Sequence, residues 1–315
     1  MLPFQTVVCA IDFTSSSAHA LIQAADVAER AHAALHLFHA VPLFRARLAA
    51  APGGDVEVLF QARATAFVNE TLGASDAAEV LAPVLHEVHG VAPSDGVLRC
   101  AESVGADLIV VGTGRPRGLD VALLGSVASE VVRRSPVPVL VVPGAADRPA
   151  ARPDAPVLVG VDFSALTAAA LRLGRTWATD YAAPLELAHV VEGTADAGPV
   201  GFLTARGRQP QSEASARATA HQALRAVAEE AGGGVAAQHV LHGRASSDLA
   251  ALASERAAGV VVVGTHGRSG IERFRLGSVA DWLARHAPCS VLVAPSEPPA
   301  SEPPASGSGV QREAS

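Results

Sequence analysis

The sequence predicts an α/β protein made of two tandem, doubly wound (Rossmann-like) domains, each with a five-stranded, mostly parallel sheet. Two observations predict this fold. The chain of 315 residues repeats itself once, and each copy alternates short Val-rich runs with longer Ala-rich stretches. Strands that alternate with helices form βαβ units and a parallel sheet. Hydrophobic residues make up 49% of the chain and aromatic residues 4%, so we expect a core of Ala, Val and Leu.

The repeat is visible as matching segments in the same order. Residues Val7–Thr14 resemble Val157–Ser164 at an offset of 150 positions. The later matches are Leu35–Val41 with Leu185–Val191, Leu108–Thr113 with Val260–Thr265, Leu124–Ala128 with Leu276–Ala280, and Ser135–Val141 with Ala287–Val293. The repeat divides the chain into residues 1–144 and 155–295. Two covalently joined copies predict an intrachain pseudo-dimer, and they leave open a homodimer of whole chains.

Each strand and helix follows from a local pattern. Short apolar runs predict strands in the first copy at Thr6–Ile11, Leu35–His39, Val80–Val88, Leu108–Val111 and Val139–Val142. The stretches between them predict helices at Ser16–Ala31, Val56–Leu72, Ser94–Val104 and Ser126–Arg134. In the second copy the strands are expected at Val157–Val161, Leu185–His189, Val235–Leu241, Val260–Val263 and Val291–Ala294. The joint between the copies lies in Gly144–Pro156. The tail, residues 296–315, repeats Ser-Glu-Pro-Pro-Ala and is expected to be disordered.

Composition excludes several classes of function. The formal net charge is −7, which gives no general attraction to nucleic acid or to an anionic membrane. No apolar run approaches the roughly 18–20 residues that cross a bilayer, and no basic segment precedes an apolar one at the start, so we expect a cytoplasmic protein. The chain has no lysine, which removes the P-loop lysine and Schiff-base chemistry. Cys9, Cys100 and Cys289 have no CxxC spacing, so no disulfide framework or zinc site is expected.

A glycine-rich pattern follows the fourth strand of the second copy. Gly264 and Gly267 are followed, nine residues later, by Gly277 and Ser278 at the start of a helix. We expect the two glycines of the loop to take positive φ and to let the backbone approach an anion. A helix N-terminus offers free N–H groups and a favourable dipole to phosphate. In parallel sheets such a position, beyond the carboxyl ends of the strands, is where ligands bind.

This pattern resembles the ATP-binding motif of the universal stress protein family, G-2x-G-9x-G-(S/T), and the opening VGVDFS resembles that family's first strand. The resemblance covers nearly all of both copies and stops at the tail. It implies a stress-response protein that binds ATP, with Asp162 at the adenine base and the backbone of Val190 or Val191 beside it. The nucleotide site that it implies also contains Gly264, Thr265, His266, Gly267, Arg268, Gly277, Ser278 and Val279. Magnesium bridging the phosphates would suit this hard-oxygen chemistry.

The first copy departs from the motif at one position. Arg115 stands where the second copy has Gly267, although Gly114 directly before it could shift the turn. Arg115 could also bind phosphate through its guanidinium. We therefore expect a weaker nucleotide site here. Its candidate residues are Asp12, Gly112, Arg115, Gly125 and Ser126.

Other interpretations of the same residues stay open at this point. Asp12 and Asp162 each precede a helix and could be structural caps. Histidines three apart on a strand, such as His36 and His39, point to opposite faces and do not suit one metal, so no metal ligand is assigned. No catalytic residue is assigned either, and a binding module that acts through its conformation is favoured. The alternatives are a slow ATPase, with candidates in His266, Arg268 and Glu272, and a nucleotide-free interaction protein.

Overall fold

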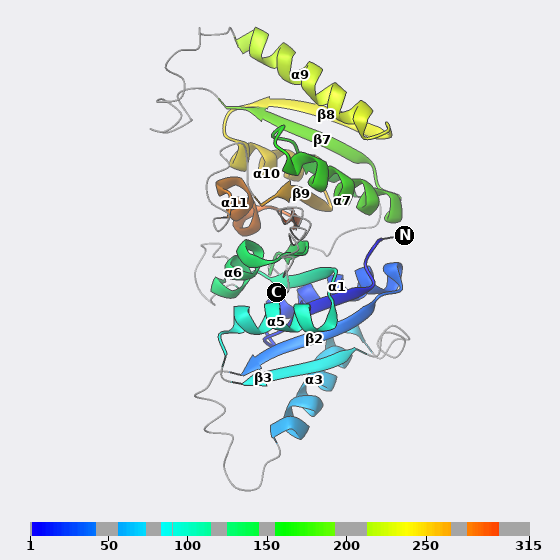
Figure 1. Ribbon diagram of the computed structural model, residues 1–315, viewed down its shortest axis with the longest axis vertical. Helices are drawn as coiled ribbons and strands as arrows, with labels where there is room; N and C mark the ends of the chain where they lie inside the picture. Colours follow the sequence, from blue (N-terminus) through cyan, green and yellow to red (C-terminus); the bar gives the residue numbers. More distant parts are fainter. Residues whose placement is uncertain are drawn as a thin grey trace, which may run out of the picture.

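The computed structural model describes residues 2–41, 56–73, 83–89, 91–114, 125–144, 155–192, 213–265 and 276–295. Within these ranges the chain folds as two halves of alternating strands and helices (Figure 1). The first half contains β1 (Thr6–Ala10), α1 (Ser15–Ala31), β2 (Ala34–Val41), α3 (Val56–Leu72), β3 (Val84–His89), α5 (Pro93–Val104), β4 (Leu108–Gly112), α6 (Ser126–Arg134) and β5 (Val139–Val142). The second contains β6 (Val157–Gly160), α7 (Leu166–Asp180), β7 (Leu185–Val191), α9 (Glu213–Glu230), β8 (Val235–His242), α10 (Ala245–Glu255), β9 (Val260–Gly264), α11 (Ser278–His286) and β10 (Ser290–Ala294).

All of these strands belong to one ten-stranded sheet. Its order is β3-β2-β1-β4-β5-β10-β9-β6-β7-β8, so the order of the second half mirrors that of the first. Strands are parallel within each half, and β5 and β10 pair antiparallel where the halves meet. Leu140 lies opposite Leu292, and these two leucines are each other's counterparts in the repeat. A pseudo-twofold axis therefore passes between them. The α/β fold with a mostly parallel sheet is confirmed, and the halves share a single sheet.

Helices cover both faces of the sheet in two layers that run through both halves (Figure 1). One apolar cluster joins α1, α3, α7 and α9 to the first face, and a second joins α5, α6, α10 and α11 to the other. The strand centres are Val-rich and fully buried, as a parallel sheet covered on both faces requires. Cys9 and Cys100 are small buried residues of this core, and Cys289 is half-buried.

The contact between the halves also includes polar groups, and these are not symmetric. The hydroxyl of Ser290 on β10 donates to Oε1 of Gln23 on α1 at 2.7 Å, and both residues are buried. The counterparts of these two residues in the repeat, Pro138 and Leu173, cannot form such a bond. The hydroxyl of Tyr181, the residue directly after α7, donates to Asp26 on α1 at 2.5 Å. A duplicated chain can therefore hold its halves together with bonds that occur only once.

A buried carboxylate marks another difference between the halves. Glu186 on β7 is almost fully buried and accepts two hydrogen bonds from Arg256, at 2.7 and 3.1 Å, and one contact from His239 at 2.9 Å. Its counterpart in the first half is His36, whose Nδ1 lies 2.8 Å from Nε2 of His86. Burial alone would raise the pKa of Glu186, but the hydrogen bonds from Arg256 and His239 outweigh it and hold that pKa below its ordinary value.

Glu186→Gln is expected to lower the free energy of unfolding by about 1–3 kcal/mol at pH 7, because it removes the buried negative charge to which Arg256 donates. A carboxyl whose pKa is lower in the folded state stabilises at a pH above its unfolded value, about 4.3. The difference in the free energy of unfolding between wild type and variant should therefore shrink as the pH falls through and below that value. Urea unfolding across pH 3–7 measures it. The exposed Glu229→Gln is the control, and a difference that grows toward low pH would contradict the assignment.

Candidate functional site

The described members of the predicted site lie at the carboxyl ends of the strands of each half, at the two places where strand order reverses. In the first half β1 lies between β2 and β4, so chain order changes direction beside it. Asp12 follows β1, and Gly112 ends the neighbouring β4. In the second half Asp162 follows β6, and Gly264 ends the neighbouring β9. In each half the aspartate and the first glycine of the motif therefore lie at the point where strand order reverses. We call this point the switch point of the half.

Each aspartate uses one carboxylate oxygen to shape the turn after its strand. Oδ1 of Asp12 accepts from the backbone N–H and the hydroxyl of Thr14, at 3.0 and 2.5 Å. Oδ1 of Asp162 accepts from the backbone N–H of Ser164 at 3.0 Å and from the hydroxyl of Thr167 at 2.9 Å. Within the described ranges Oδ2 of either residue has no hydrogen bond. The structural role and a ligand-binding role are therefore compatible, because they use different oxygens.

A strained phenylalanine follows each aspartate. Phe13 has φ of 62° and Phe163 has φ of 59°, a left-handed conformation that is rare for a bulky side chain. Each ring packs on a histidine of the next strand, with centroids 4.7 Å apart for Phe13 and His39 and 4.4 Å apart for Phe163 and His189. Such strain persists only where the surroundings enforce it, and it concentrates at functional sites.

The two histidines are also fixed by hydrogen bonds to the first strand. Nδ1 of His39 lies 2.8 Å from the carbonyl oxygen of Ile11, and Nδ1 of His189 lies 2.6 Å from that of Val161. A carbonyl oxygen only accepts, so Nδ1 carries a proton in both rings. In the neutral imidazole Nε2 is then an acceptor. Sequence reasoning missed the phenylalanines and histidines as site residues, although the repeat retained both at matching positions.

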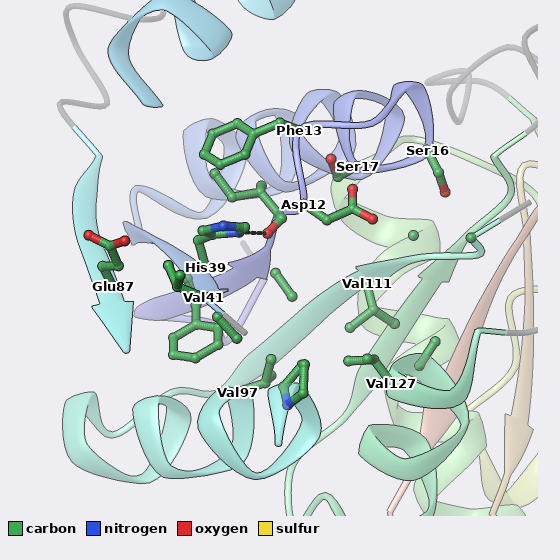
Figure 2. A pocket seen from close by; sticks show the side chains of 18 of the residues that line it. Asp12, Phe13, Ser16, Ser17, His39, Val41, Glu87, Val97, Val111 and Val127 are labelled. Atoms are coloured by element: carbon green, nitrogen blue, oxygen red, sulfur yellow. Dashed lines mark hydrogen bonds between the residues drawn. The ribbon is translucent and has the colours of Figure 1, made fainter. Parts of the chain in front are cut away.

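A cavity of about 640 Å³ opens at the carboxyl edge of the first half (Figure 2). Its walls come from the ends of β1, β2 and β4, from the first turn of α1 at Ser16 and Ser17, and from α3, α5 and α6. Asp12 and His39 line it, and Figure 2 shows them on its sheet side, with Val111 and Val127 farther along the wall. Its volume lies within the range of small-molecule sites, and most of its lining is apolar.

Beside each switch point a helix begins without a side-chain cap. Gly125 precedes α6 and Gly277 precedes α11, and neither N-terminus has a side-chain hydrogen bond. The first backbone N–H groups of a helix have no partner within the helix, so they are available to an anion. Ser126 and Ser278 are the first residues of these helices, and Ser278 is exposed. Val279 is half-buried beside it.

Comparisons with known proteins show the family to which the chain belongs. The model of the universal stress protein family matches residues 3–143 and again residues 155–295. The chain belongs to the universal stress protein family. A universal stress protein of Mycobacterium tuberculosis is 31% identical over 194 residues, which cover 59% of this chain and 58% of that protein. The aligned part thus spans little more than half the length of this curated relative.

Solved universal stress proteins share the tandem arrangement. A structure from Pseudomonas aeruginosa has a TM-score of 0.64 and 18% identity, and the match covers 94% of this chain and 95% of that one. At this identity the likeness establishes the fold. A universal stress protein solved in complex with cAMP is 29% identical over 45% of this chain, with a TM-score of 0.34. The prediction of a tandem universal stress protein is confirmed.

The glycines of this universal stress protein have different physical roles from the expected one. Gly264 is the last residue of strand β9 and is not among the residues with positive φ, so the expected left-handed turn is wrong at that position. Its counterpart Gly112 is required for packing, because a Cβ there would lie 2.7 Å from the backbone oxygen of Ser16. Thr113, the next residue, accepts at its carbonyl a 2.6 Å hydrogen bond from the Ser16 hydroxyl.

Other predicted residues of the second half are placed as follows. Thr265 is buried, and its N–H donates to the carbonyl of Ala294 at 3.0 Å, while its own carbonyl accepts from Gly277 at 2.6 Å. Val190 and Val191 end β7, and the carbonyl of Val191 accepts from the N–H of Gly243 at 3.1 Å. The remaining predicted site residues lie outside the described ranges. They are Arg115, His266, Gly267 and Arg268.

The described residues include neither a metal-binding cluster nor a membrane-spanning helix. Among the described residues no group of three or more His, Cys, Asp and Glu side chains could hold a metal ion. His36 and His39 contact different partners, His86 and the Ile11 carbonyl, as expected for opposite faces of a strand. Of the helices in the described ranges, none has the length and apolarity to cross a membrane.

Gly112→Ala is expected to destabilise the first half, because its new Cβ would overlap the backbone of Ser16 at the start of α1. Overpacking of this kind costs about 1–3 kcal/mol. Gly114→Ala is the matched control, since a Cβ there meets nothing within 4 Å. Its effect should stay within about 0.5 kcal/mol. Chemical denaturation of both variants measures the difference, and equal stabilities would show that Gly112 is not held by packing.

Proposed function

We propose that this universal stress protein binds an adenine nucleotide, ATP, at the carboxyl ends of its strands, and that it acts as a regulatory binding module in a stress response. One observation carries the proposal. In each half an aspartate, one of whose carboxylate oxygens has no hydrogen bond within the described ranges, lies beside a strained Phe–His pair, and the last helix of the half begins without a side-chain cap. A base-binding group and a phosphate-binding group are thus combined at one switch point.

The chemistry of each group suits one part of the nucleotide. Oδ2 of Asp162 can accept a hydrogen bond from the amino group of adenine. The backbone N–H groups at the start of α11, with the exposed hydroxyl of Ser278, can donate to phosphate oxygens. Magnesium would bind phosphate oxygens, which are the hard ligands that it prefers. The protein's part in this chemistry is to bind and orient the nucleotide.

The two halves are proposed to differ in affinity, with ATP bound chiefly by the second half. That half has the complete glycine motif, whereas Arg115 replaces one glycine in the first half. A side chain that hinders close approach of phosphate needs to cost only about 1.4 kcal/mol to weaken binding tenfold. A cytoplasmic location and a homodimer of whole chains stay predictions.

Titration calorimetry with ATP is expected to show one strong site per chain. Asp162→Ala and Gly267→Arg should remove it, whereas Asp12→Ala, its matched control, should leave it in place. The two tryptophans, Trp177 and Trp282, both lie in the second half, so a change in their fluorescence would report binding there. Arg115→Gly should strengthen ATP binding by the first half, because it restores the glycine that lets phosphate approach the backbone. Two equal sites in the wild type, or unchanged binding in Gly267→Arg, would contradict the proposal.

A further inference from the structure

The two outer strands of the sheet, β3 and β8, are held by different side-chain contacts. Within the described ranges each of them pairs with a neighbouring strand on one side only (Figure 1). In the second half Glu186 of β7 joins His239 of β8 to Arg256, the residue directly after α10. The equivalent positions of the first half are occupied by His36 on β2, His86 on β3 and Val104 on α5.

The first-half contact joins two imidazole rings. Nδ1 of His36 lies 2.8 Å from Nε2 of His86, and the rings stack with centroids 5.1 Å apart. At this distance one nitrogen donates and the other accepts, so at least one of the two rings has to be neutral. When both rings are protonated, two N–H donors and two positive charges face each other. The contact therefore breaks when the second ring gains its proton.

The histidine pair lies on the face of the sheet that α5 covers. His36 is the register partner of Val8 on β1, and Val8 belongs to the apolar cluster of that face. Side chains alternate along a strand, so the neighbouring Glu87 on β3 points to the opposite face, as does His39 on β2. Helices α1 and α3 cover that opposite face. The charges that face the pair from another element are therefore those of α5.

The titratable groups of α5 form no bond to either ring among the described residues. These groups are Asp95, Arg99, Cys100 and Glu102. Asp95 accepts from Arg134 of α6, and the side chains of Arg99 and Glu102 are exposed to solvent. Burial raises the pKa of the Cys100 thiol to about 11, so this group stays neutral. The first half thus places no carboxylate beside its histidines, unlike the second.

Acid acts differently on the two contacts. Burial and the neighbouring His86 hold the pKa of His36 below its ordinary value. Such a histidine stabilises the fold fully above its unfolded value, about 6.5, and this contribution is lost as the pH falls below it toward the lower folded value. In the second half, protonation of His239 places a positive charge beside Glu186, whose own pKa is held below its ordinary value. The proton that breaks one contact strengthens the other.

We propose that the contact between His36 and His86 is an acid-sensitive fastening of the outer strand β3, closed at neutral pH and open below about pH 6, while β8 stays fastened by Glu186. Helix α5 follows β3 in the chain, and Pro93 and Val97 of α5 line the first-half cavity. Acid therefore loosens one wall of this cavity and leaves the second half in place. The switch is independent of which ligand either half binds.

Hydrogen exchange of the full chain at about pH 7.5 and about pH 5.5 tests this switch, because peptides from β3 and β8 report the two outer strands separately. Protection is expressed relative to an unstructured peptide at the same pH, which removes the intrinsic effect of pH on exchange. In the wild type the protection of β3 should fall about threefold to tenfold at the lower pH, the effect of losing one hydrogen bond. The protection of β8 should stay within about twofold or rise.

Variants of the pair separate its charge from its packing. His86→Gln removes one charge and keeps an amide that can donate to His36, so the fall in β3 protection should disappear. His36→Gln should have the same effect through the other ring. His36→Glu combined with Val104→Arg introduces the residues of the second half, so β3 protection should hold or rise at the lower pH. His221→Gln, on α9 outside the pair, is the control and should keep the wild-type response.

The comparison of β3 with β8 in the wild type needs no substitution, so it tests the switch even where a variant does not fold. Equal β3 protection at the two pH values, a fall that β8 shares, or a fall that persists in the glutamine variants would each overturn the proposal. Thermal melts at the higher pH identify the variants that fold, and either glutamine variant is sufficient for the comparison.

Discussion

The antiparallel pairing of β5 with β10 is the constraint on which the arrangement of this molecule depends. Each half alone would leave its fifth strand as an open sheet edge, with unpaired backbone groups. Pairing Leu140 with its own counterpart Leu292 closes both edges at once and joins the two sheets into one. Because the pairing is antiparallel, the carboxyl ends of the two halves point in opposite directions. The two candidate sites therefore lie at opposite edges of the common sheet, and each is built from its own half.

Covalent duplication lets the halves differ where an identical pair could not. Phe38 is fully buried against α5, where Gly96 leaves room for its ring, and a Cβ at Gly96 would collide with it. The second half has Ala188 and Asp248 at these positions, and the carboxylate of Asp248 lies beside Gly243. The bond between Ser290 and Gln23 likewise needs only one copy of each residue. In a symmetric homodimer every such substitution would appear twice and would have to fit both environments.

Much of the fold was predictable because strand and helix patterns here are strong and local. The helices Val56–Leu72 and Ser126–Arg134 begin and end at the predicted residues, and the strand Val139–Val142 does too. The pairing of β5 with β10 has no local signal, because its residues look like any buried parallel strand. At the candidate site, the place of Asp12 and Asp162 directly after β1 and β6 was predictable from the strand pattern, and their role toward a ligand stays a prediction. The left-handed φ of Phe13 was not, because bulky residues seldom adopt it and only tertiary packing enforces it.

The comparison of the halves separates what the fold requires from what the ligand requires. The aspartate, the strained phenylalanine, the histidine bound to the first strand and the glycine before the last helix occur in both halves. The aspartate and the histidine hold the end of the strand and the turn after it through hydrogen bonds to backbone groups, so both halves share this part of the frame. Glu87 and Val240 differ, and both side chains lie on the same face beside the fixed histidine. A position on the face of the sheet can therefore differ between the halves while the strand pairing around it stays the same.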